Sequence, residues 1–80
     1  MRKYDPFTTW LKSQKDTRLV VAFDTIEQII GDQLPRSART YRPWWGNELG
    51  ASSRQCSAWL AGGWHVQSVD LADGTVTLMR

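Results

Sequence analysis

The chain has 80 residues and a formal charge of +2, which allows one domain with a thin hydrophobic core. So short a chain leaves little volume for a catalytic cavity, and we expect a protein that is not an enzyme. The single cysteine excludes an internal disulfide and offers no metal-site pattern, so no metal or cofactor is expected. Without a long apolar run or the apolar core of a signal peptide, the chain is predicted to be cytoplasmic, with no membrane contact.

The N-terminal part predicts a helix, a strand and a second helix. Asp5 and Pro6 suit the start of a helix over residues 6–14. The β-branched run at 18–23 predicts a short strand. A capping box, Asp24 with the glutamate three residues later, predicts a helix that ends at Gly31.

The next segment predicts a turn and an arginine-bearing helix. Residues 32–35 form the turn, and the helix runs to about Tyr41, because Pro43 disfavours helical geometry just before it. Trp44 and Trp45 then lie at or beyond the helix end. Together with the preceding helix, this segment is typical of a helix-turn-helix.

The C-terminal part predicts one more helix and a hairpin. The helix covers about 53–61, and its inner face includes Cys56, which we interpret as a buried small side chain. Alternation from Trp64 to Leu71 predicts a strand with Trp64, Val66, Ser68 and Asp70 on one face. Asp73-Gly74 is a strong turn signal before the last strand.

This order of elements predicts one α+β domain over residues 1–80. It would be winged helix-turn-helix-like, with three to four short helices and a small antiparallel sheet that ends in a C-terminal β-hairpin. The helix around Trp59 is additional to that pattern. The first strand would pair with the hairpin to close a three-stranded sheet.

Seven residues are the candidates for nucleic-acid or partner binding. Guanidinium groups at i, i+3 and i+6 could hold phosphates or read guanine edges, aromatic rings could stack on bases, and an asparagine could bond a base edge. A solvated charged face, core packing of the tryptophans and a loop-capping asparagine are the alternatives. The candidates are Arg36, Arg39, Arg42, Tyr41, Trp45, Asn47 and Arg54.

Three further observations bear on this interpretation. Lys12, Lys15, Arg18 and Arg54 are scattered in the sequence but could reach the same surface as the helix arginines. The predicted hairpin tip carries Asp73, whereas a wing that grips a phosphate backbone is usually basic. The lone His65 has no partner pattern for metal binding or acid–base chemistry.

Five motifs span nearly the whole chain and resemble those of a family of small, functionally uncharacterised bacterial and phage domains. The departures are Phe7 in place of a usual Leu and Gly63 as an extra residue. The resemblance supports the boundaries, suggests a phage or mobile-element setting and supplies no catalytic residue. The motifs are Tyr4-Asp5-Pro6-Phe7, residues 23–31 (FDTIEQIIG), Leu34-Pro35-Arg36-Ser37-Ala38-Arg39, Trp44-Trp45-Gly46-Asn47 and residues 58–64 (AWLAGGW).

Two functions from different classes follow as hypotheses. The first is a small DNA-binding module that uses the arginine-bearing helix, for which a homodimer would be natural. The second is a phage or mobile-element inhibitor that binds an acidic or DNA-binding surface of a host protein complex. An anti-CRISPR protein that blocks DNA binding by a surveillance complex is an example, and arginines beside exposed aromatic rings suit such an interface.

Overall fold

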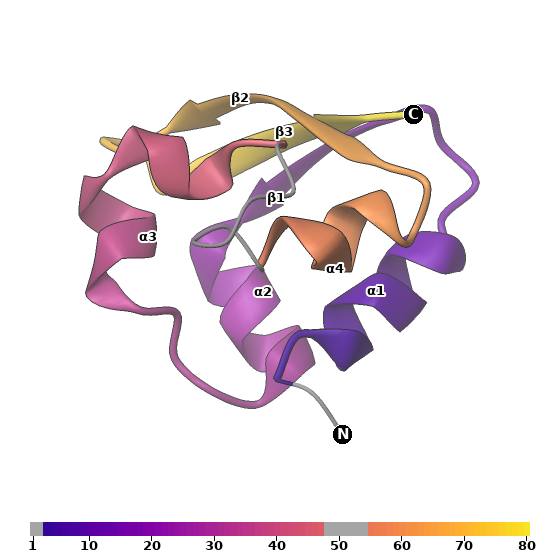
Figure 1. Ribbon diagram of the computed structural model, residues 1–80, viewed down its shortest axis with the longest axis horizontal. Helices are drawn as coiled ribbons and strands as arrows, with labels where there is room; N and C mark the ends of the chain where they lie inside the picture. The colour runs from indigo at the N-terminus through magenta and orange to yellow at the C-terminus, as the bar shows by residue number, and fades with distance from the viewer. Residues whose placement is uncertain (1–2, 48–54) are drawn as a thin grey trace.

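The computed structural model describes residues 3–47 and 55–80, which form a small α+β fold (Figure 1). Its α-helices are α1 (Asp5–Lys12), α2 (Phe23–Ile30), α3 (Arg36–Thr40) and α4 (Cys56–Leu60). A 3-10 helix, η1 (Arg42–Trp45), follows α3. The strands are β1 (Arg18–Ala22), β2 (His65–Asp70) and β3 (Thr75–Met79). The predicted combination of short helices and a small antiparallel sheet is confirmed.

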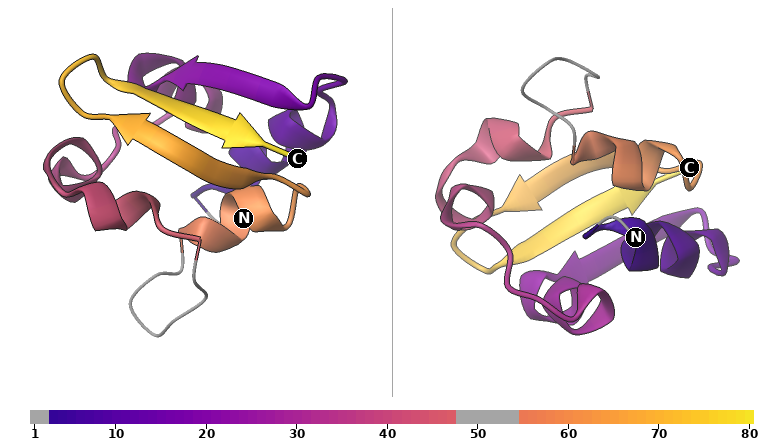
Figure 2. Two further views of the ribbon diagram at one scale, coloured as in Figure 1. Left: turned by 90° about the horizontal axis from the view of Figure 1, so that it is seen from above. Right: turned by 60° about the horizontal axis from the view of Figure 1, so that its bottom comes forward.

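The sheet is antiparallel in the order β1-β3-β2, so β3 is central and β1 and β2 are the two edges. The helices lie on one face of the sheet, and the other face is open (Figures 1 and 2). The inward rows of the sheet are apolar, because alternate residues of each strand point to the same face. These rows are Leu19–Leu78–Val66 and Val21–Val76–Val69.

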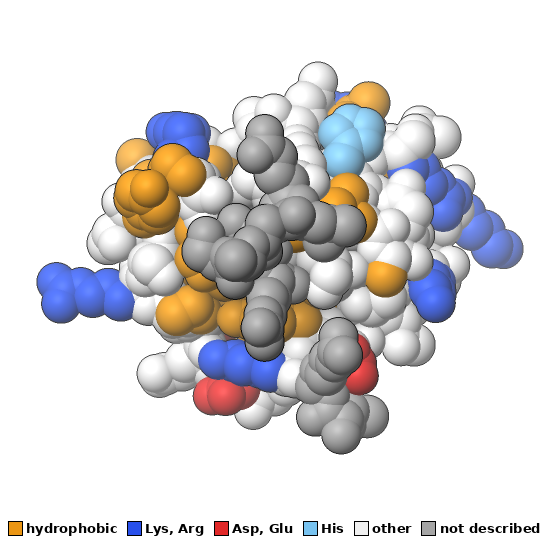
Figure 3. Space-filling model, viewed as in Figure 1, with side chains coloured by type: hydrophobic (Ala, Val, Ile, Leu, Met, Phe, Trp, Pro, Cys, Tyr) orange, Lys and Arg blue, Asp and Glu red, His pale blue; other side chains and the backbone are white. Residues whose placement is uncertain are grey.

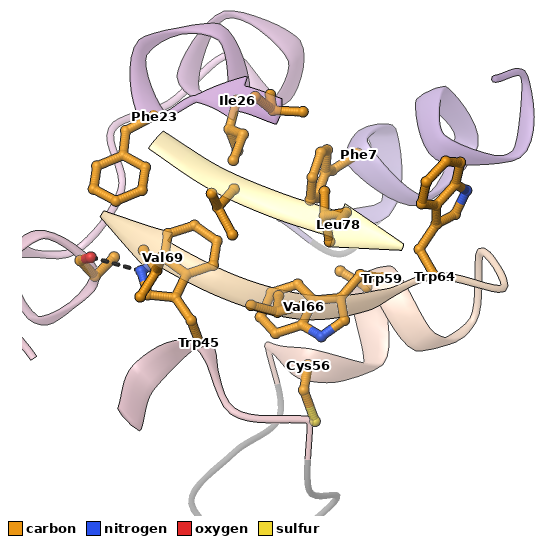
Figure 4. Close-up of a cluster of buried hydrophobic side chains, with 14 of the residues drawn as sticks. Phe7, Phe23, Ile26, Trp45, Cys56, Trp59, Trp64, Val66, Val69 and Leu78 are labelled. Carbon is orange, nitrogen blue, oxygen red and sulfur yellow. Dashed lines mark hydrogen bonds between the residues drawn. The ribbon is translucent and has the colours of Figure 1, made fainter. Parts of the chain in front are cut away.

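Large aromatic side chains fill the space between the sheet and the helices (Figure 4). Trp45 is 2% exposed, and its ring stacks on Phe23 at 5.1 Å and on Trp59 at 5.7 Å between centroids. The buried Trp64 donates its indole N–H to the carbonyl of Leu11, 3.1 Å away, which fixes the end of α1 against the start of β2. Such rings bury large apolar areas, which compensates for the small number of core residues.

A β-bulge between Val66 and Ser68 changes the predicted face pattern of β2. The predicted alternation put Val66 and Val69 on opposite faces, but both are buried against the helices. Ser68 and Asp70 are exposed, so their assignment to the same face as Val66 is wrong. The extra residue at the bulge restores an apolar inner face after Gln67.

The helix starts also differ from the sequence-based expectations. Helix α2 begins at Phe23, its N-cap is Ala22, and no side chain caps it. Glu27 instead accepts a hydrogen bond from the backbone N–H of Leu34 at 2.8 Å, so it ties α2 to the following turn. The expected end at Gly31 is confirmed, since its φ of 69° lies in the left-handed region that glycine favours.

Other boundaries shift by a few residues. Helix α1 covers Asp5–Lys12 rather than 6–14, and α3 ends at Thr40, two residues before the Arg42-Pro43 pair. Strand β1 ends at Ala22 rather than at residue 23, which opens α2. Helix α4 is described as Cys56–Leu60, and the predicted start at 53 lies outside the described residues.

Candidate functional site

The three arginines of the α3 region point in different directions. Ala38 is fully buried and marks the core side of α3, and Arg36 lies two residues before it, on the exposed side. Arg36 forms no ion pair or hydrogen bond through its guanidinium with the described residues. It is therefore the one arginine of this group whose charge is not engaged within that part of the chain.

Arg39 is engaged in contacts within the fold. Its guanidinium lies 3.1 Å from an Asp24 carboxylate oxygen and 2.9 Å from one of Glu27, and it sits over the Phe23 ring at 5.6 Å. Hydrogen bonds to Glu27 and then to Asp24 raise the pKa of the Arg39 guanidinium. Two carboxylates thus balance the positive charge of Arg39 and join α3 to the start of α2.

Arg42 and Asn47 bind the outer edge of β2. The Arg42 guanidinium donates to the carbonyl of Val69. The Asn47 amide donates to the carbonyl of Val66 at 2.8 Å, and its oxygen accepts from the Val66 N–H at 2.8 Å. The same oxygen accepts from the Trp59 indole N–H at 3.0 Å. These contacts give both residues a structural role, while partner binding by either stays a prediction.

The aromatic candidates separate into one buried and one exposed ring. Trp45 donates its indole N–H to the carbonyl of Ala38 at 2.7 Å inside the core, so the expectation that its ring is free to stack on a base is wrong (Figure 4). Trp44 is half-buried in edge contact with Trp45. Tyr41 is 58% exposed and keeps its ring available. Arg54, the seventh candidate, lies outside the described residues.

A second group of cations gathers at the opposite end of the sheet. Arg18 shares an outward-facing row with Met79 and His65, and the Arg80 N–H donates to the carbonyl of Thr17 at 3.0 Å. Lys12 ends α1, and the loop that holds Lys15 leads from α1 to β1. We call Lys12, Lys15, Arg18 and Arg80 the basic end.

The side chains of the basic end are exposed, and none forms an ion pair within the part of the chain that the structure describes. The Arg80 guanidinium stacks over Trp64 at 4.9 Å, a contact that leaves its charge uncompensated. Asp16 is the one acid between residues 12 and 18. On the face drawn in Figure 3, lysine and arginine side chains are visible on the side where α1 ends and the C-terminus lies, and no acidic side chain is visible beside them.

The hairpin end of the sheet is acidic by contrast. Asp24 and Glu27 stand on α2 there. Asp70 ends β2 and Asp73 lies in the β2–β3 turn, where an Asp70 oxygen accepts from the Asp73 N–H at 2.9 Å.

The expectation that Lys12, Lys15 and Arg18 share a surface with the α3 arginines is wrong. The start and the end of β1 are about 13 Å apart at the rise of a strand, and α3 lies at its end.

Three further observations concern the described residues. A shallow groove is lined by Asp24, Glu27, Gln28, Gly31, Asp32 and Gln33. No cluster of three or more metal-ligating side chains occurs among residues 3–47 and 55–80. No helix within those residues is long and apolar enough to cross a membrane.

The fold and these surfaces define a small α+β domain. The chain belongs to the family described as a domain of unknown function, DUF7662, whose model matches residues 4–80. The family resemblance expected from the motifs is thereby confirmed at the level of an uncharacterised small domain. Comparisons with curated proteins and with solved structures find no match.

Proposed function

We propose that this protein is a small nucleic-acid-binding module that contacts the phosphate backbone of DNA through its basic end. The observation that carries the proposal is the gathering of four cations without ion-pair partners among the described residues. Phosphate contacts need exposed positive charge that is not already neutralised. The basic end meets that requirement better than the α3 region, where Asp24 and Glu27 already bind Arg39.

The winged helix-turn-helix relationship is part of the same proposal. The order of α1, β1, α2, α3, β2 and β3 and the sheet order β1-β3-β2 support it, with η1 and α4 as an insertion. The five residues of α3 span about 7.5 Å, which is short for a helix that reads a groove. We therefore assign the contacts with the DNA phosphate backbone to the basic end. In the α3 region, Arg36 and the adjacent Tyr41 keep exposed side chains, but we assign them no phosphate contact.

Fluorescence anisotropy with a labelled DNA duplex at about 50 and 200 mM salt tests the proposal. Four phosphate contacts predict a slope of log affinity against log salt of roughly −3 to −4. Lys15→Ala should weaken binding and reduce the slope by about one, and Lys12→Ala/Lys15→Ala by about two.

Arg36→Ala is the matched control, because it also removes one exposed cation that has no ion pair among the described residues. It should leave affinity and slope close to those of the wild type. The assignment to the basic end would be overturned if Arg36→Ala lost binding while the lysine variants kept it. No binding by the wild type at low salt would overturn the DNA proposal itself.

A second candidate function is inhibition of a host protein complex through an acidic or DNA-binding surface. The 58% exposure of Tyr41, which stands next to Arg42 and after the arginine-bearing helix, favours it. Exposed tyrosines and arginines are frequent binding hot spots. A partner captured from a host lysate by the wild type but not by Tyr41→Ala would support this function, and equal recovery by both would count against it.

A further inference from the structure

The two edge strands differ in whether other parts of the fold bond their outward backbone groups. At β2, Asn47 occupies both backbone groups of Val66, and Arg42 occupies the carbonyl of Val69. At β1, no side chain or turn of the described residues bonds the outward backbone groups. An edge with free N–H and C=O groups is a template for another strand.

The hydrogen bonds at the two ends of β1 show which groups are free. The Thr17 carbonyl accepts from the Arg80 N–H, and the Phe23 N–H donates to the carbonyl of Gly74. Residues 17, 19, 21 and 23 therefore face β3, because antiparallel strands bond their neighbour at every second residue. The N–H and C=O groups of Arg18 and Val20 and the N–H of Ala22 point away from β3, whereas the Ala22 carbonyl accepts the first hydrogen bond of α2 as its N-cap.

We propose that a second copy of this chain pairs with this edge, β1 against β1 in the antiparallel direction, with Val20 at the two-fold axis. The two sheets then continue into one sheet of six strands. Val20 faces Val20 of the other copy, and Arg18 faces Ala22 of the other copy. Up to four backbone hydrogen bonds form: two between the facing Val20 residues, and one from the Ala22 N–H of each copy to the Arg18 carbonyl of the other.

Charge and exposure identify the second copy as the occupant. Arg18 and Lys15 stand near the start of β1, and the exposed Asp24 follows its end. In this register Asp24 of one copy lies just beyond Ala22, the residue that Arg18 of the other copy faces. Lys15 and Arg18 therefore flank Asp24 across the axis and outnumber the one acid between them, Asp16. Val20 is 57% exposed on the open face, and the pairing covers it with a matching β-branched side chain.

The tryptophans have no part in this contact. All five tryptophans are buried or half-buried, so none offers a free ring to a second copy. The contact involves one short strand from each copy, so we expect a weak dimer with a Kd on the order of 0.1–1 mM. The inference does not rest on nucleic-acid binding, and its test contains no nucleic acid.

Sedimentation equilibrium over a range of protein concentrations measures the dimer. Val20→Pro removes an N–H that points away from β3, so it should keep the folded monomer and weaken the dimer at least tenfold. Val20→Thr keeps that N–H and is the control, with a dimer constant within about threefold of the wild type. Circular dichroism establishes that both variants are folded.

A charge exchange tests the register and remains decisive if Val20→Pro fails to fold. Arg18→Glu places a negative charge beside Asp24 of the other copy and should weaken the dimer several-fold. Arg18→Glu/Asp24→Lys should restore it toward the wild-type constant. A monomeric wild type at millimolar concentration would overturn the proposal, and so would a dimer that none of these variants changes.

Discussion

Asn47 binds Val66 in the way a neighbouring β-strand would. Its side-chain amide satisfies the N–H and the C=O of the same residue, both at 2.8 Å, and also receives the Trp59 indole N–H at 3.0 Å. One side chain thus closes the edge of β2 and connects it to α4. The Trp-Trp-x-Asn motif consequently has a structural explanation in this fold.

Replacement of Asn47 should destabilise the fold. In Asn47→Ala the Val66 groups and the Trp59 indole lose their partner, and we expect a loss of about 2–3 kcal/mol in the free energy of unfolding. Urea denaturation measures this loss, and hydrogen exchange of the Val66 amide should become faster. Gln67→Ala, at an exposed position of the same strand, is the control and should change stability by less than about 0.5 kcal/mol. If Asn47→Ala also changes the free energy of unfolding by less than about 0.5 kcal/mol, then water replaces the hydrogen bonds of the side chain at no net cost.

Trp45 should matter for stability rather than for binding. Trp45→Phe removes the indole donor of the 2.7 Å bond to Ala38 and part of a buried ring, so it should cost about 2–3 kcal/mol in thermal or urea unfolding. Trp10→Phe is the comparison, because Trp10 is half-buried and stacks on Phe7 at the rim of the core. DNA affinity of folded Trp45→Phe should equal that of the wild type, and a selective loss of affinity would assign a binding role to this ring.

Arg39 makes two ion pairs, but its replacement should have a small effect. The side chain is 40% exposed, and exposed ion pairs contribute little because water and salt screen them. Arg39→Ala should lower the free energy of unfolding by about 0.5–1 kcal/mol in urea denaturation at low salt, and by less at high salt. A loss that salt does not reduce would point to packing of Arg39 on Phe23 instead.

The Cys56 thiol should be protected and should make stability depend on alkaline pH. Burial raises the pKa of Cys56 above its ordinary value of 9.0. Above pH 9 the unfolded chain loses this proton while the folded chain keeps it, so stability falls as pH rises. Cys56→Ala should show a flatter pH dependence of stability between pH 8 and about 10. A thiol reagent should label the native protein far more slowly than the urea-unfolded protein, and equal rates would contradict the burial.

The sequence predicted features that local chemistry determines. The glycine at the end of α2 and the Asp73-Gly74 turn were expected correctly, because each depends on the conformational preferences of a few adjacent residues. The bulge after Val66 was missed, since strict alternation allows no extra residue. The partners of Arg39 and Asn47 were missed because they depend on tertiary packing.

The basic end was missed for a similar reason. Lys12, Lys15 and Arg18 lie close together in the chain, but Arg80 is distant from them, and the hydrogen bond from the Arg80 N–H to Thr17 brings it to the same end of the sheet. Arginines at i, i+3 and i+6 of a predicted helix were a stronger signal in the sequence. In the fold, however, that helix packs beside acidic residues of α2, which pattern alone did not reveal.

An NMR titration of isotope-labelled protein with a short DNA duplex at about 50 mM salt would show whether the basic end binds DNA. We predict that the amide signals of residues 12–18 and of Arg80 shift on addition of DNA, while those of α3 change little. Shifts centred on Arg36 and Tyr41, or no shifts at all, would contradict the assignment of nucleic-acid binding to the basic end.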